Sequence, residues 1–439
     1  MKPNGLFAAI GVLAVLGGLV WWTGKNPKPE APATPASPKI LAIPENQIEG
    51  LRIAKTGAEP IVLKNLAGNW AIAEPKQMAA DQDAVKQLTG SLTALNADRL
   101  IDEHPASLNE FGLSAPTAEI DVTVKGGAVT KLLLGGDTPS GSDTYARVDG
   151  KAPVYTIASS TKATFDKSVN DLRDKRLLPF NQDKVTAISV TSKGPAFEFG
   201  KNGQGEWQIT KPKPMRADSI QVDDFVRKLK EAKMDLAAPA VGKVDRTKVG
   251  AKVGSVAVTD NSGTQTLTVL KPVDAKETGY YAKSSLSDET YKLSGDFGDA
   301  LKDKDVDSFR NKKLFDFGFN DPSKIELNGV DYSKAGDKWM SSAGQMDAPS
   351  IQNVIDKLRD LTAVKFMDKP AGAQALALAV TSGDNHKVEK VVVNKSGEEY
   401  NALREGELTV YAIDAKAVDD LQKAISGIKH YQPPKPAKK

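Results

Sequence analysis

The sequence has no cysteine and only three histidines, His104, His386 and His430. Without cysteine, disulfide bonds, thiolate metal ligands and cysteine nucleophiles are excluded. The histidines are also too far apart in the chain to form the closely spaced pairs of a histidine metal site. We therefore expect no metal site and no cofactor.

Aromatic residues are scarce as well, at 6% of the chain, which is few for a carbohydrate-binding surface. The formal net charge is +3, but the positive excess belongs to the two ends of the chain. When the four bases and one acid of residues 1–44 and the three lysines of the C-terminal tail are removed, 52 bases and 55 acids remain. A slightly acidic body argues against a phosphate-binding surface, so we expect no nucleic-acid partner.

One long apolar run is present at the N-terminus. Residues 5–23 carry no charge and are long enough to cross a hydrocarbon layer at about 1.5 Å per residue. The alternative is a cleaved signal peptide, but no small-x-small cleavage site directly follows Trp21 and Trp22. We predict a transmembrane anchor in residues 1–24. Because lysines lie on both sides of the span, the charge distribution does not decide its orientation. A large body after a single span favours an inner-membrane protein whose bulk is periplasmic.

Prolines dominate the segment that follows. Residues 25–44 form a Pro-rich linker, whose composition favours an extended conformation of about 3.1 Å per residue. Residues 431–439 form a second short segment of proline and lysine at the other end. Both segments predict tethers rather than folded structure.

Between them, one amphipathic helix recurs three times. Each copy begins at an aspartate, Asp81, Asp218 or Asp347, and places apolar residues 4, 7 and 11 positions further on. Aspartate is a favoured N-cap residue, and the spacing puts one apolar stripe against a core. The repetition predicts three copies of one domain, because a spacing near 137 residues is far too long for a solenoid unit.

A tryptophan precedes each of these helices, at Trp70, Trp207 and Trp339. Exposed indoles could form platforms that stack a glycan or a lipid. The simpler interpretation is that the same residue fills the same core position in each copy, because indole is highly buried on average. Tyrosines recur too, as Tyr155 and Tyr291 in the first two copies, and more loosely as Tyr411 in the third.

The first two copies close with matching basic runs. They contain Arg173, Lys175 and Arg176, and then Arg310, Lys312 and Lys313. These cations are candidates for contact with an acidic partner or with lipid headgroups. The competing interpretation is that each run marks a joint between domains, where cations favour the C-terminal end of a helix. No such run closes the third copy.

Short alternating runs joined by turn residues predict hairpins, and residues 159–173 predict a closing helix. The fold class is therefore α+β: an N-terminal transmembrane helix followed by three tandem related domains of antiparallel sheet plus helices. We place the domains at residues 45–180, 181–317 and 318–430, with the third shorter and divergent.

The chain resembles the DUF4340 family of bacterial envelope proteins. The resemblance rests on the anchor, the Pro-rich tether, the Trp-x-Ile-x-x-Pro run at Trp70, the turn from Phe111 to Pro116, Tyr145-Ala146-Arg147 and the Arg-Asp-Lys-x-Leu-Leu run at Arg173. It implies a partner of the ABC-2-type permease or gliding-motility-like auxiliary class. The family has no established catalytic residues, so the resemblance implies none here.

Local motifs do not indicate an enzyme. Asp102, Glu103 and His104 are consecutive, so they share no helix face, and the acidic run from Asp299 to Asp307 lacks the glycine and terminal glutamate of a calcium loop. We expect no catalytic, cofactor-binding or metal-binding residues, and a non-catalytic, membrane-anchored accessory or scaffold subunit of an ABC-type envelope transport complex. The alternatives are a periplasmic glycan- or lipid-binding module and, third, an envelope hydrolase.

Overall fold

The computed structural model describes residues 37–238, 240, 248–320 and 322–433. The predicted anchor in residues 5–23, most of the Pro-rich linker and the end of the C-terminal tail lie outside the described residues. Among the residues described, no helix is long and apolar enough to cross a membrane.

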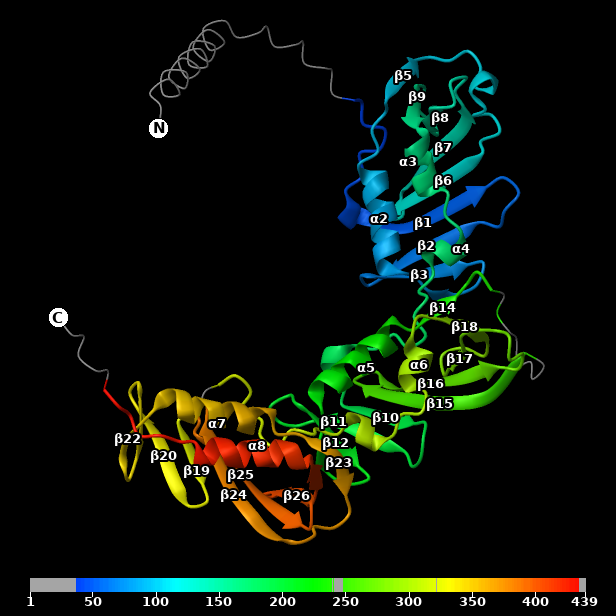
Figure 1. The fold of residues 1–439 in the computed structure, drawn as a ribbon. Helices are drawn as coiled ribbons and strands as arrows, with labels where there is room; N and C mark the ends of the chain where they lie inside the picture. The colour runs from blue at the N-terminus through cyan, green and yellow to red at the C-terminus, as the bar shows by residue number, and fades with distance from the viewer. Residues whose placement is uncertain (1–36, 239, 241–247, 321, 434–439) are drawn as a thin grey trace, which may run out of the picture. The chain divides into compact units, whose positions relative to one another are not determined.

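Each repeat is built on one nine-stranded antiparallel sheet (Figure 1). The first sheet contains β1 (Ile48–Lys55), β2 (Ile61–Leu66), β3 (Asn69–Glu74), β4 (Met78–Ala79), β5 (Arg99–Asp102), β6 (Ala118–Val124), β7 (Val129–Asp137), β8 (Asp143–Val148) and β9 (Val154–Ala158). The second contains β10 (Ala187–Thr191), β11 (Phe197–Lys201), β12 (Trp207–Lys211), β13 (Met215–Arg216), β14 (Lys233–Asp235), β15 (Val249–Asp260), β16 (Gly263–Pro272), β17 (Tyr281–Ser284) and β18 (Thr290–Ser294). The third contains β19 (Lys324–Leu327), β20 (Val330–Ala335), β21 (Lys338–Ser341), β22 (Gly344–Met346), β23 (Ala363–Met367), β24 (Ala373–Ser382), β25 (Lys387–Ser396), β26 (Glu399–Arg404) and β27 (Val410–Ile413).

The strand order is the same in all three sheets. In the first it runs β4-β3-β2-β1-β6-β7-β8-β9-β5, and the order of the second and third corresponds to it strand by strand. Every strand pairing is antiparallel, as the hairpin pattern predicted. The predicted class, tandem repeats of antiparallel sheet with helices, is confirmed.

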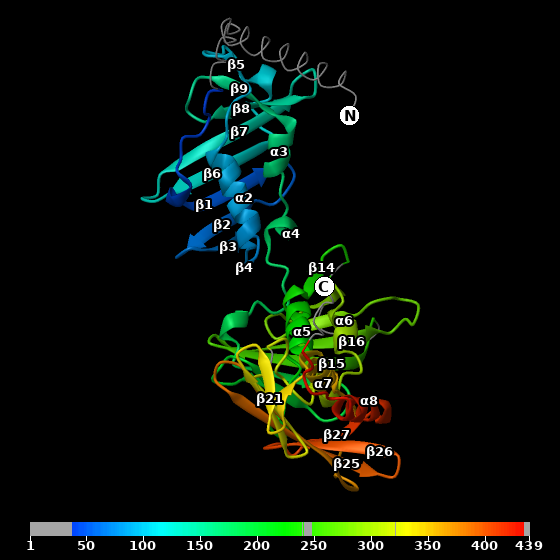
Figure 2. The same cartoon turned by 60° about the vertical axis from the view of Figure 1, so that its left-hand side comes forward.

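One long helix follows the fourth strand of each sheet: α2 (Gln82–Thr93), α5 (Ser219–Glu231) and α7 (Ala348–Asp360). The predicted N-caps are confirmed, since the carboxylates of Asp81, Asp218 and Asp347 each accept hydrogen bonds from first-turn amides. Figures 1 and 2 show α2 against one face of its sheet. The apolar stripe of each helix packs on the inward residues of that sheet, which gives one core per repeat.

The closing segment of the first repeat differs from the prediction of one helix over residues 159–173. It forms two short helices, α3 (Ser159–Phe165) and α4 (Val169–Leu172). The break has a local cause: the Ser168 hydroxyl and the Asp171 carboxylate form a reciprocal capping box that starts a new helix. Arg173 is then extended and forms a β-bridge with Ala80. The second repeat closes in the same way, with α6 (Phe297–Leu301), the 3-10 helix η4 (Val306–Phe309) and a bridge from Arg310 to Ala217.

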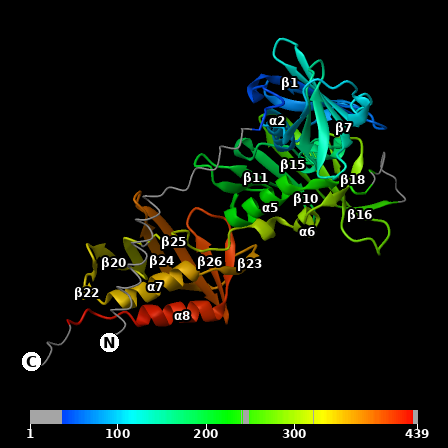
Figure 3. The ribbon, with the colours of Figure 1, turned by 90° about the horizontal axis from the view of Figure 1, so that it is seen from above.

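The third repeat keeps this closing pairing although its basic run is lost. Its last helix, α8 (Ala415–Ser426), packs beside α7 (Figure 3). The chain then returns to the sheet, where His430 forms a bridge with Met346. The bridge depends on backbone hydrogen bonds, so it tolerates the change from arginine to histidine.

The segment that enters each repeat also has a fixed place in the fold. Lys39, Arg176 and Lys313 form β-bridges with Asn96, Lys233 and Thr362, respectively. The apolar residues that follow pack into the core of the repeat they enter: Ile40 and Leu41, then Leu177 and Leu178, then Leu314 and Phe315. Each core therefore recruits residues from before the predicted boundaries at 45, 181 and 318. The chain divides into two compact units, residues 1–175 and 176–439, and the second unit holds two repeats.

Glycine is required at one close backbone approach in the first repeat and at another in the third. Gly112 has a φ of +66°, and an added Cβ would lie 2.7 Å from the amide nitrogen of Gly136. Gly372 of the third repeat has a φ of +83°, and an added Cβ would lie 2.0 Å from the carbonyl oxygen of Lys395. No motif in the third copy predicted this close approach. The structure nevertheless has it there, and Gly372 is the residue that permits it.

Candidate interaction site at the joint between the second and third repeats

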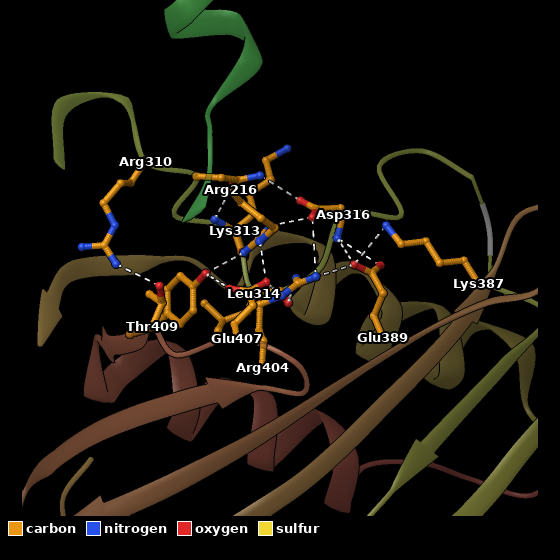
Figure 4. Close-up of polar contacts among 12 residues, drawn as sticks. Arg216, Arg310, Lys313, Leu314, Asp316, Lys387, Glu389, Arg404, Glu407 and Thr409 are labelled. Carbon is orange, nitrogen blue, oxygen red and sulfur yellow. Dashed lines mark hydrogen bonds and ion pairs between the residues drawn. The ribbon is translucent and has the colours of Figure 1, made fainter. Parts of the chain in front are cut away.

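The second basic run leads into a polar joint inside the second unit (Figure 4). The Arg310 guanidinium lies 3.5 Å from the ring centroid of Phe366 on β23. It also donates to the hydroxyl of Thr409 at 3.0 Å and pairs with Asp307 at 2.8 Å. Only 12% of the Arg310 side chain is exposed, so most of its surface is in contact with other parts of the protein. This supports the joint interpretation for Arg310.

Arg216, at the end of β13, reaches furthest across the joint. Its guanidinium donates to the Asp316 carboxylate, and its Nε lies 2.8 Å from a carboxylate oxygen of Glu407. Its Nη2 donates to the carbonyl oxygen of Lys313 at 2.6 Å and to the hydroxyl of Tyr411 at 3.0 Å. One side chain of the second repeat thus binds the connecting segment and the third sheet together.

Arg404 completes the network from the other side. Its guanidinium lies 2.8 Å from Glu407 and 2.9 Å from Glu389, and it donates to the carbonyl oxygen of Leu314. The Glu389 side chain is only 2% exposed, and its two oxygens also accept from the amide of Asp316 at 3.1 Å. A carboxylate buried this deeply is stable only with such partners.

Burial and charge shift two titrations in the joint. Burial raises the pKa of Tyr411 to about 12, and its hydrogen bond to Glu407 at 2.6 Å acts in the same direction. Burial alone would lower the pKa of Arg216, but Asp316, Tyr411 and Glu407 outweigh it and raise that pKa. Both groups therefore keep their protons across the physiological range, and the arrangement fastens surfaces rather than moving protons.

The six predicted contact cations have different surroundings. Lys312 and Lys313 have exposed side chains, whereas the other four are half-buried: Arg173, Lys175, Arg176 and Arg310. The structure brings Arg310 into the joint through its side chain and Lys313 through its backbone carbonyl. Lys312 and Lys313 are therefore the exposed cations of the second run.

The three tryptophans do not share one environment. Trp207 and Trp339 are each 5% exposed and belong to the cores of their repeats, as the core interpretation expects. Trp70 is only half-buried, at the margin of its core. The tryptophan is therefore fully within the core in the second and third repeats, but only partly in the first.

Sequence reasoning missed most of the joint. Arg216 and Tyr411 are 195 residues apart, and neither Glu389 nor Arg404 lies in a repeated motif. Two signals were available: the second closing run, which contains Arg310, Lys313 and Asp316, and the repeated tyrosine, because Tyr411 is the third copy of Tyr155 and Tyr291. Among the residues described, no group of histidine and acidic side chains is placed to hold a metal ion. His104, His386 and His430 are all exposed.

These observations define a class of protein: tandem copies of a nine-stranded sheet module, of which the second and third are fastened together at the segment that connects them. The family model for DUF4340, a domain of unknown function, matches residues 70–207 and again residues 207–379. The chain belongs to this family, and the two matches meet at Trp207. No curated protein and no solved structure matches the chain.

Proposed function

We propose that this protein is a non-catalytic, membrane-anchored scaffold, an accessory subunit of an ABC-type transport complex in the bacterial envelope. The observation that carries the proposal is the joint described above. The arginines and carboxylates of the joint bind the second repeat to the third. A scaffold needs such fixed joints to hold its binding surfaces in place.

The anchor gives the scaffold its location. We place residues 5–23 in the inner membrane as a single span and the three repeats in the periplasm. A Pro-rich tether of this length keeps the first repeat within reach of a membrane partner. The partner is then an ABC-2-type permease or a gliding-motility-like auxiliary subunit, as the family resemblance implies.

The second basic run offers a defined contact for that partner. Arg310 is engaged inside the protein, whereas Lys312 and Lys313 carry two exposed positive charges side by side on the connecting segment. Two solvated ammonium groups beside a fixed joint suit an acidic surface of a partner. They contribute most to the rate of association and to its dependence on salt.

The test is recovery of the complex. A tagged full-length chain is extracted from its own membranes in mild detergent, and the co-purifying proteins are quantified. We expect a membrane permease or auxiliary subunit in stoichiometric amount, and recovery of this chain without one would refute the proposal.

A matched pair of variants tests the contact itself. Lys312→Glu combined with Lys313→Glu should reduce recovery of the partner at least fivefold. Lys334→Glu combined with Lys338→Glu makes the same change in charge at two exposed lysines of the β20–β21 hairpin and should leave recovery unchanged. Equal losses in both double variants would show that only net charge matters, and would remove Lys312 and Lys313 as a specific contact.

A further inference from the structure

Trp70 is the exception among three equivalent tryptophans. In the second repeat, the indole Nε1 of Trp207 donates to the Asp223 carboxylate at 2.7 Å, and the ring is 5% exposed. The residue 137 positions before Asp223, at the same place on helix α2, is Lys86. A lysine cannot accept from an indole N–H, so the contact that fixes Trp207 has no counterpart of that kind in the first repeat.

The helix beside Trp70 is changed at a second place. Eight residues after the capping aspartate, the second and third repeats have Val226 and Ile355 in their apolar stripes, whereas the first has Thr89. The Thr89 side chain is buried, and its hydroxyl donates to the Glu45 carboxylate at 3.0 Å. A polar pair therefore stands where the other two repeats have hydrocarbon.

These changes surround an open groove of about 590 Å³ with Trp70 in its wall. The other side chains that line it include Glu45, Asn46, Asn65, Lys86 and Thr89. The volume falls in the range of small-molecule sites, and an aromatic wall with a few polar groups is their usual composition. The groove lies within the first unit, between η1 (Glu45–Gln47), the β2–β3 hairpin and helix α2.

The backbone of Trp70 is held by hydrogen bonds to Gln82, while its half-buried side chain packs against the core and also forms part of the groove wall. The Gln82 carboxamide accepts from the Trp70 amide at 2.8 Å and donates to the Trp70 carbonyl at 2.9 Å. The side-chain Oδ1 of Asn65 accepts from the amide of Gly68 at 2.8 Å, which orients the side-chain NH2 group as a remaining donor. Rigid positioning of this kind lowers the entropic cost of binding.

We propose that this groove binds an oligosaccharide, with one sugar ring stacked on the indole of Trp70. A pyranose has a face of C–H groups that fits an aromatic ring and a rim of hydroxyl groups that needs fixed donors and acceptors. Asn46, Asn65 and Lys86 supply donors around the ring, and the Glu45 carboxylate supplies an acceptor. A lipid chain would instead require a wall without these polar groups. The inference goes beyond the scaffold function and does not depend on it.

The experiment is saturation-transfer NMR on the full chain in micelles of a detergent without a sugar headgroup. Four soluble tetrasaccharides at 5 mM are the probes: chitotetraose, its N-acetylated form, cellotetraose and maltotetraose. We expect transfer to the ring protons of at least one, together with quenching of tryptophan fluorescence. Transfer to none of the four would overturn the proposal, as would transfer only to the detergent chains.

Variants assign the binding to the groove. Trp70→Ala should abolish the transfer, but it could also perturb the fold. Lys86→Asp keeps the tryptophan and restores the residue of the second repeat, so it should pair with the indole and weaken binding at least tenfold. Gln87→Ala, at the next exposed position of α2, is the control and should bind like the wild type. Unchanged binding by both Trp70→Ala and Lys86→Asp would show that the sugar binds elsewhere and overturn the assignment.

Discussion

The guanidinium of Arg310 stacks on the ring of Phe366, 3.5 Å from its centroid, and thereby joins the segment that closes the second repeat to an edge strand of the third. An arginine over an aromatic ring gains both electrostatic attraction and contact area, and it remains charged at any physiological pH. Its motif partner in the first repeat is Arg173, which forms the corresponding backbone bridge with Ala80. The basic runs thus have a structural role in each of the first two repeats.

Arg216→Met should weaken the joint strongly. It would remove one of the two arginines that pair with Asp316 and Glu407, the other being Arg404, in a site where each carboxylate side chain is at most a quarter exposed. Removing one member of such a buried network costs about 3 kcal/mol of unfolding free energy. Urea unfolding, with hydrogen exchange read at β13 and β27, measures the loss. Arg227→Met on the exposed side of α5 removes pairs to Asp224 and Glu231 and should change the unfolding free energy far less, because solvent screens exposed ion pairs. Equal costs would contradict the assignment of the joint.

Gly372→Ala should be among the most damaging single substitutions in the second unit. The new Cβ would meet the Lys395 carbonyl oxygen, and the left-handed backbone at a φ of +83° adds strain. We expect a loss of about 3 kcal/mol or more. Gly397→Ala shares the positive φ, +63°, but has open space around the new Cβ, so it should cost only about 1 kcal/mol. Thermal unfolding of the two variants separates the clash from the backbone strain.

Asp218→Ala should destabilise α5 by about 1 kcal/mol, because it removes the side-chain acceptor for the Gln221 amide at the start of the helix. Asp218→Asn keeps an acceptor and should recover most of the loss. The free energy of opening of the first-turn amides, measured by hydrogen exchange, checks this. If asparagine restored nothing, the charge of Asp218 and not its hydrogen bond would be the stabilising feature.

Asp260 should make the stability of the second repeat depend on pH. Hydrogen bonds from the hydroxyl and amide of Ser262 and from the amide of Asn181 hold the pKa of this carboxyl below its usual value of 3.8. Because the folded pKa is depressed, the stabilisation is complete above the unfolded pKa and is lost as the pH falls through the folded pKa. Asp260→Asn should therefore lower the melting temperature at pH 7, and the difference from wild type should shrink below about pH 4. Asp288→Asn, an exposed control, should show no such convergence.

Local patterns allowed much of the fold to be predicted. The aspartate caps and the apolar offsets indicated α2, α5 and α7, because both signals act within a few turns of the chain. The hairpins followed from alternation and turn residues for the same reason. The prediction of a single helix for the closing segment of the first repeat was wrong, because the capping box at Ser168 competes locally with continuation of the helix.

Local sequence patterns did not allow the joint or the groove to be predicted. The joint pairs Arg216 of the second sheet with Glu407 and Tyr411 of the third repeat, and only the packing of these two repeats brings the residues together. The groove depends on residues that differ between the copies, such as Lys86 and Thr89, whereas a repeat pattern consists of residues that the copies share. The low aromatic content argued against a sugar-binding surface over the whole chain, yet one half-buried indole is enough for one site.

The bridges formed by Lys39, Arg176 and Lys313 at one edge of each sheet, and by Arg173, Arg310 and His430 at the other, affect how such a protein can lengthen. An uncovered edge strand is a template for aggregation. Here each copy brings its own covers for both edges, because the connecting segments that duplicate with it supply them. Gene duplication can therefore add a copy without exposing a strand, and a truncation is best made between residues 175 and 176, where neither neighbouring sheet loses its cover.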